Sequence, residues 1–258
     1  MSKKRAFVRY TKSGEIVPGS LIITTNGGYP DKSSLWQEVS AYKCCDDSGN
    51  CPPVTSFCAE NWAFENFDGT TFRNGDPIPQ VTNDAAWASL TTPAWCYFLN
   101  DTDNGRIYGK LYNGYAINDS RGLAPEGWRI PTKNDWTNLY KCLGGEIISD
   151  YEFGGYTTVG NKMKTTGNTD DNTGLWDYGN PGATNSSGFS VLPGSFRSGL
   201  PLGVFPVPPT NNGAVFWTSS QYDSNNNFAS IFNSQLDISY FLFNHNTYGC
   251  SVRLIKDI

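Results

Sequence analysis

Alternation of apolar and polar residues predicts antiparallel strands near the C-terminus of the chain. The segments "AVFWTSS" (214–220) and "CSVRLI" (250–255) alternate apolar and polar side chains, as strands with one buried face do. Near the N-terminus, turn sequences separate three short β-prone runs, "RAFVRY", "EIVPGSLIITT" and "SLWQEVSAY". The pattern therefore predicts strands at both ends.

One segment has the spacing of an amphipathic helix. In "PTKNDWTNLYKCLGG" (131–145) apolar residues fall at i, i+3, i+4 and i+7, namely Trp136, Leu139, Tyr140 and Leu143. Thr132 with Asp135 three residues later is typical of a helix N-cap, and two glycines can end the helix. The segments 110–119 and 82–90 each predict a short helix or turn. The residues expected in the core are Trp128, Trp136, Leu139 and Trp217.

The segment from Tyr222 to Tyr248 has the composition of neither a core strand nor a flexible tail. It holds six Asn, four Ser, four Phe and three Tyr, and its only charges are Asp223 and Asp237. In antibody binding loops Tyr supplies rigid contact area, while Ser and Asn supply adaptable hydrogen bonds. We therefore predict that this segment binds a ligand. The predicted contact residues are Tyr222, Asn225, Asn226, Phe228, Phe232, Asn233, Tyr240, Phe241, Phe243, Asn244, His245, Asn246 and Tyr248.

Composition and charge exclude several classes of function. Among 258 residues, 27 Gly and 15 Pro with few long helical patterns favour a turn-rich, mixed or strand-dominated fold. The net charge of −5 argues against general nucleic-acid binding, which needs a basic face. The sequence has no run of 18 consecutive apolar residues, so we predict no membrane-spanning helix. The basic N-terminus lacks the apolar core of a signal peptide, so we expect a protein made in the cytoplasm.

Charge also divides the chain into two parts. The first 57 residues carry seven Lys and Arg against five Asp and Glu, a net of +2, while the rest carry twelve against nineteen, a net of −7. The segment "CCDDSGNCPPV" between them has the composition of a linker. We predict a β-rich attachment or oligomerisation segment with its linker at 1–53, and one domain at 54–258.

No pattern of catalytic or metal-binding residues stands out. Seven cysteines without an export segment favour reduced thiols. The spacing of the four between 44 and 58 fits no familiar zinc pattern, and His245 is the only histidine. The acidic loops at 100–105 and 168–174 do not have the EF-hand spacing and are interpreted as turns. We therefore expect no enzyme activity, no cofactor and no metal.

Several strings together resemble a known family, the Fibrobacter succinogenes major paralogous domain. They cover residues 54–258 in the expected order and include "AENW", "TFRNGDPIP", "WCY", "NGRIYGKLYN", "GLAPEGWRIPTKNDW", "GNKMK", "GATNSSGFSVLPG", "FWTSS" and "YGCSVRLIKD". The resemblance implies an α+β, C-type lectin-like fold with two helices, a small twisted antiparallel sheet, long loops and paired domain ends. It also implies that residues 222–248 lie on the ligand-binding face. Variable proteins of this fold are diversified by retroelements that mutate adenines, and within this interval only Gln235 lies outside the residues accessible from Asn codons.

The start of the chain resembles, more loosely, structural proteins in phages of gut Bacteroides. The hypothesis that follows is a bacteriophage virion protein, in a head fibre, decoration or tail-fibre tip. We expect residues 1–53 to bind virion proteins and residues 222–248 to bind a host-surface protein or gut glycan. By analogy with phage fibres we expect a homotrimer. The alternatives are a bacterial cell-surface adhesin and a purely structural virion component without an external ligand.

Overall fold

A computed structural model of the chain describes residues 60–148, 153–206 and 211–257 with their side chains, and the backbone of four strands before them. Three of these strands form an antiparallel sheet of order β2-β1-β3: β1 (Lys4–Arg9), β2 (Ile22–Thr25) and β3 (Trp36–Val39). The prediction of three N-terminal strands is confirmed. The attachment role of this segment stays a prediction.

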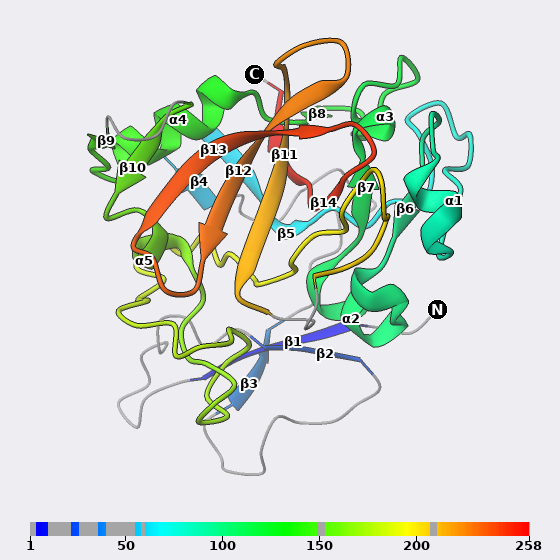
Figure 1. The fold of residues 1–258 in the computed structure, drawn as a ribbon. Helices are drawn as coiled ribbons and strands as arrows, with labels where there is room; N and C mark the ends of the chain where they lie inside the picture. The colour runs from blue at the N-terminus through cyan, green and yellow to red at the C-terminus, as the bar shows by residue number, and fades with distance from the viewer. Residues whose placement is uncertain are drawn as a thin grey trace.

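The larger part of the chain has an α+β fold built on antiparallel sheets (Figure 1). Its main sheet has five strands in the order β11-β12-β13-β10-β9. These are β9 (Ile147–Ile148), β10 (Gly155–Thr157), β11 (Gly213–Gln221), β12 (Asn226–Asn233) and β13 (Ile238–His245).

Two smaller sheets complete the fold. One has the order β4-β5-β15-β8 and the other β14-β7-β6. Their strands are β4 (Thr55–Phe57), β5 (Glu60–Asn66), β6 (Trp95–Cys96), β7 (Leu111–Asn113), β8 (Trp128–Arg129), β14 (Gly249–Cys250) and β15 (Arg253–Lys256). Because β5 pairs with β15, the two ends of the predicted domain meet in one sheet, as the resemblance implied.

Five α-helices are described, and four of them are short, so the expected number of two helices is wrong. They are α1 (Asp84–Ala88), α2 (Thr102–Tyr108), α3 (Gly114–Ile117), α4 (Lys133–Cys142) and α5 (Gly160–Met163), with a 3-10 turn η1 at Phe98–Asn100. The interpretation of 100–105 as a turn is wrong, because this segment begins α2. The Asp101 side chain accepts a hydrogen bond from the Asp103 N–H, and Gly109 ends the helix with a φ of 75°. No described helix is long and apolar enough to cross a membrane.

The helix α4 confirms the predicted capping pattern. The Thr132 hydroxyl accepts a hydrogen bond from the Asp135 N–H, and the Asp135 carboxylate accepts one from the Thr132 N–H at 2.6 Å. The same carboxylate accepts hydrogen bonds at 2.5 and 3.0 Å from the Arg129 guanidinium. Burial raises the pKa of Asp135, but the hydrogen bonds from Arg129 and Thr132 outweigh it and hold the pKa below 3.8.

Replacing Asp135 by asparagine should therefore destabilise the protein by about 1–2 kcal/mol at neutral pH, because the cap and the ion pair are both weakened. A lowered folded-state pKa gives stability that is present above pH 3.8 and is lost as the pH falls through the folded-state value. Urea unfolding of the two proteins should show their difference shrinking at acidic pH. A difference that stays constant from neutral to acidic pH would contradict this account.

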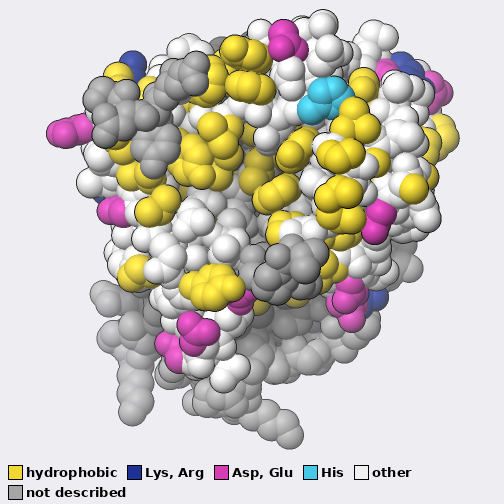
Figure 2. All heavy atoms as spheres, in the orientation of Figure 1, with side chains coloured by type: hydrophobic (Ala, Val, Ile, Leu, Met, Phe, Trp, Pro, Cys, Tyr) yellow, Lys and Arg dark blue, Asp and Glu magenta, His cyan; other side chains and the backbone are white. Residues whose placement is uncertain are grey.

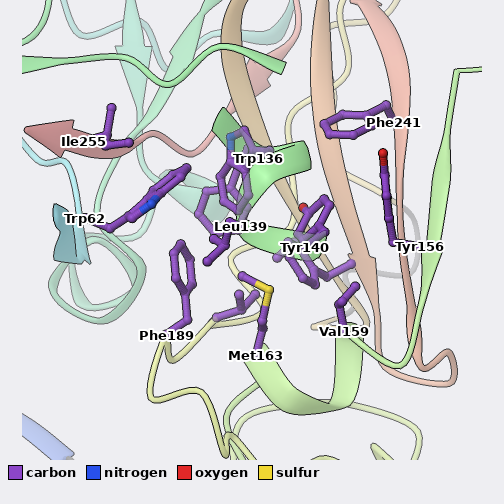
Figure 3. Close-up of a cluster of buried hydrophobic side chains, with 14 of the residues drawn as sticks. Trp62, Trp136, Leu139, Tyr140, Tyr156, Val159, Met163, Phe189, Phe241 and Ile255 are labelled. Carbon is purple, nitrogen blue, oxygen red and sulfur yellow. The ribbon is translucent and has the colours of Figure 1, made fainter. Parts of the chain in front are cut away.

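The core between α4 and the main sheet is mainly aromatic (Figure 3). Trp136 lies at its centre, with ring centroids 4.8 Å from Trp62 and 5.5 Å from both Phe189 and Phe216. Trp136, Leu139 and Trp217 are buried as predicted. Trp128 is half-buried and packs against a second core cluster from β8, the edge strand of its sheet, so its prediction as a core residue is confirmed only in part.

Four cations are buried among the described residues, and they donate mostly to backbone carbonyls: Lys110, Lys164, Arg197 and Arg253. Lys164 has no exposed surface, and its ammonium donates to the carbonyls of Asn233, Ser234 and Leu236 at 2.9–3.0 Å. Arg197 and Arg253 likewise bond carbonyls of distant segments. Burial lowers the pKa of Lys164 to about 8. Each of these side chains ties loops or strand ends to the core.

Candidate ligand-binding face

The Asn- and aromatic-rich segment forms the centre of the main sheet. Its two strands, β12 and β13, pair antiparallel from Asn226–His245 to Phe232–Ser239. β11 pairs along β12, whereas β10 pairs with β13 only at Ile238–Tyr240, so among the described strands the end of β13 that carries Phe243 pairs with β12 alone. Since neighbouring side chains along a strand point to opposite faces, the segment divides into two sets of residues.

One set points toward α4 and is buried in the middle of the sheet. Phe232 and Phe241 are 0% and 1% exposed and belong to the core around Trp136. The buried serines Ser230 and Ser239 form a hydroxyl network with the Tyr140 hydroxyl. The abundance of Ser in this segment therefore partly reflects core hydrogen bonding.

Three predicted contact residues are thereby corrected. Phe232 and Phe241 are covered by α4 and its neighbours, and Asn246 is buried where its backbone N–H bonds the Asn225 carbonyl. These side chains do not lie at the exposed surface, so the prediction that they contact a ligand is wrong. The sequence composition did not distinguish the half of the strand that α4 covers from the half beyond it.

Beyond the end of α4 the same face becomes exposed and carries four aromatic rings, which we call the aromatic patch: Phe153, Tyr222, Phe228 and Phe243. Tyr222 and Phe243 are 47% and 39% exposed and stack nearly parallel, with centroids 4.3 Å apart and planes at 7°. Phe228 meets Tyr222 edge-on at 5.6 Å, and Phe153 meets Phe243 edge-on at 5.3 Å. The patch is therefore a pair of parallel stacked rings, and two half-buried rings pack edge-on against this pair.

A lysine from α4 lies beside the patch. The Lys133 ammonium is 4.4 Å from the ring centroid of Phe228 and 5.3 Å from that of Phe241, the geometry of a cation–π contact. No carboxylate of the described residues pairs with it. Burial lowers the pKa of Lys133.

Polar groups border the patch at the turn between β11 and β12. The Asp223 carboxylate accepts hydrogen bonds from the Asn225 N–H at 2.8 Å and from the Asn226 side-chain amide at 2.8 and 2.9 Å. Asn225 is exposed, while Asn226 and His245, which pair across the strands, are half-buried. The His245 Nδ1 accepts a hydrogen bond from the Thr247 N–H at 3.2 Å and lies 2.9 Å from the Thr247 hydroxyl.

The remaining predicted residues lie away from the aromatic patch. Tyr240 and Asn244 alternate with the α4-facing residues of β13 and so point to the opposite face of the sheet. Tyr248 stacks on Phe196 at 6.1 Å, and Asn233 lies at the turn between β12 and β13. Sequence reasoning missed Phe153 and Lys133, which reach the patch from distant parts of the chain. Figure 2 shows hydrophobic side chains spread over the face in view, with acidic side chains at its margin and the single histidine near its top.

A family comparison covers most of the chain. The family described as the Fibrobacter succinogenes major domain matches residues 57–256. The chain belongs to this family. Searches of the curated proteins and of the solved structures found no match. Three of the four buried cations lie in recognised strings of the Fibrobacter succinogenes major domain: Lys110 in "NGRIYGKLYN", Lys164 in "GNKMK" and Arg253 in "YGCSVRLIKD".

A shallow hollow of about 400 Å³ lies elsewhere on the Fibrobacter succinogenes major domain. It is lined by Phe67, Gly69, Thr71, Phe72, Arg73, Gly75, Leu123, Pro125 and Glu126. Arg73 donates to the carbonyls of Ala124 and Trp128, so its guanidinium holds two loops together. These interactions account for Arg73 as part of the scaffold.

The cysteines of the domain take different forms. Cys96 and Cys250 are free and buried, and burial raises the pKa of Cys96 to about 12 and that of Cys250 well above its usual value. Such thiols are protonated and unreactive at neutral pH. Cys142 is disulfide-bonded, so its interpretation as a reduced thiol is wrong. Within the described ranges no three His, Cys, Asp or Glu side chains gather as a metal site would require.

Proposed function

We propose that this protein is a bacteriophage virion component, in a head fibre, decoration or tail-fibre tip, that attaches to the host surface through the aromatic patch. The observation that carries the proposal is the exposed Tyr222–Phe243 stack on the main sheet. Clustered exposed aromatics on a packed scaffold are typical of a binding site, whereas singly exposed ones are not. The ligand in this proposal is a host-surface protein or a glycan.

The proposed scaffold for this face is a C-type lectin-like domain. Several features support it: the paired domain ends β5 and β15, the single longer helix α4 packed on the main sheet, and the long loops between short elements. In this arrangement β12 and β13 pair with each other as far as Asn226 and His245 and pack against the core below α4, which orders their exposed ends before a ligand binds. Such preorganisation lowers the cost of binding.

The N-terminal sheet is the proposed attachment device, and a homotrimer is the proposed assembly. Three short strands are too few to bury a core of their own, so a partner's surface or further copies would complete them. Residues 1–57 carry a net charge of +2, opposite to the remaining chain, which suits a contact with an acidic virion surface.

Replacing Tyr222 or Phe243 by alanine should weaken binding of the full-length protein to host cells by about tenfold or more, because central aromatic anchors commonly carry over 1.4 kcal/mol. Tyr178→Ala is the matched control, since Tyr178 is 53% exposed and lies outside the patch. Binding of the labelled protein to cells, measured by flow cytometry, separates these outcomes. Equal binding by wild type, Tyr222→Ala and Phe243→Ala would refute the proposed face.

Immunogold labelling decides where the protein is carried. Antibodies against the full-length protein should label phage particles. Particles from a phage whose gene lacks the codons for residues 1–53 should not be labelled. Labelling of bacterial envelopes without particles would instead support a cell-surface adhesin.

A further inference from the structure

We propose that the aromatic patch and Lys133 form one binding site for an acidic sugar residue. The sugar ring would lie on the Tyr222–Phe243 stack, and its carboxylate would meet the Lys133 ammonium. This inference rests on the proposed function, because it names the ligand class of the same face.

The first support is the charge of Lys133. Its ammonium lies over the rings of Phe228 and Phe241, partly removed from water, and pairs with no carboxylate of the described residues. Ring faces compensate only part of the lost hydration. A ligand carboxylate would supply the missing counter-charge through charge-assisted hydrogen bonds. The Lys133 ammonium is therefore electrostatically complementary to an anion.

The second support is the position of the flat stack relative to this charge. Phe228 contacts both parts of the site, because its centroid is 5.6 Å from that of Tyr222 and 4.4 Å from the Lys133 ammonium. A ligand covering Phe228 would touch the stack and the cation together. The C–H face of a pyranose ring is flat and apolar and packs on aromatic rings, while its acidic substituent projects from the ring edge. An acidic sugar has both features within one residue.

The third support is the polar border of the patch at the turn between β11 and β12. The Asn225 side chain and the Asp223 carboxylate provide donors and acceptors for sugar hydroxyls. Asp223 would repel the carboxylate of the sugar, so the Lys133 ammonium is the group suited to bind it. The opposite charges of Lys133 and Asp223 therefore favour one orientation of the sugar.

The test measures binding of the full-length protein to matched acidic and neutral saccharides by isothermal titration calorimetry. One pair is 3′-sialyllactose and lactose, and the other is tri-galacturonic acid and its methyl ester. For at least one pair the acidic member should bind with a Kd about tenfold lower. Raising the ionic strength should weaken the acidic member and leave the neutral one unchanged.

Variants of Lys133 connect the preference to the structure. Lys133→Met should bring the acidic saccharide to the affinity of its neutral twin, while Lys133→Arg, which keeps the charge, should retain most of the preference. Lys141→Met, an exposed lysine of the same helix, is the control. Thermal melts of each variant show whether it is folded. If Lys133→Met does not fold, the acidic preference of Lys133→Arg still tests the inference.

The outcomes distinguish this inference from the proposed function. Equal affinity for both members of each pair, or an acidic preference that survives in Lys133→Met, would overturn the inference. It would equally fall if no saccharide bound. In these cases the proposed function is still supported if Tyr222→Ala loses binding to host cells. It is refuted if Tyr222→Ala binds host cells normally.

Discussion

Replacing Trp136 by alanine should destabilise the protein by about 3–5 kcal/mol, the usual cost of emptying a large aromatic site in a core. The ring is completely buried and contacts residues from four other segments, including Trp62, Phe189 and Phe216. These neighbours belong to separate strands and loops, so they cannot collapse together into the space. Urea unfolding followed by tryptophan fluorescence and circular dichroism measures the loss.

Trp128→Ala is the matched control for this prediction. Trp128 lies four residues before the α4 N-cap but is only half-buried, so its removal should cost clearly less. Similar losses in both variants would mean that the effect comes from removing any tryptophan near α4. A Trp136→Ala protein within about 1 kcal/mol of wild type would contradict the packing described for this core.

Replacing Lys164 by methionine should destabilise the protein by about 2–4 kcal/mol and should also weaken binding at the aromatic patch. The ammonium donates to three carbonyls at the turn between β12 and β13, and methionine fills much of the space but donates nothing. Buried acceptors left without donors cost about 1–3 kcal/mol each, partly offset because the buried charge is also removed. The turn should loosen, and the two strands that carry the patch should be less firmly held.

Lys141→Met provides the control, because Lys141 is exposed on α4 and its removal should change stability by no more than about 0.5 kcal/mol. Hydrogen exchange then locates the effect of Lys164→Met. Faster exchange should be concentrated in residues 226–245, with the paired strands β5 and β15 changing less. Uniformly faster exchange through the whole domain would show that Lys164 supports the core generally, without a special role at this turn.

Local patterns predicted the parts of the fold that depend on nearby residues. The spacing of Trp136, Leu139 and Tyr140 gave α4, and Thr132 with Asp135 gave its start, because a helix and its cap are formed by residues three or four apart. The segment 100–105 was misinterpreted because its acidic residues suit a loop as well as the capped first turn of α2.

The binding face was predictable as a segment and not residue by residue. Composition identified the stretch that holds Tyr222, Phe228 and Phe243, which gather in the patch. It also included Phe232 and Phe241, because burial depends on where α4 ends above the sheet, and that is a tertiary property. Phe153 and Lys133 come from other parts of the chain and join the patch only through strand pairing and helix packing, so no local signal could find them.

The bonds of Lys164 have a consequence for how this protein can be altered. A backbone carbonyl is the same chemical group in every amino acid. The hydrogen bonds from Lys164 to Asn233, Ser234 and Leu236 therefore do not depend on the side chains at these positions. Substituting side chains at the exposed end of the hairpin leaves that anchor chemically intact. The domain is therefore suited to serve as a display framework, in which libraries of randomised residues at Tyr222, Asn225 and Phe243 are selected for new targets on one fixed backbone.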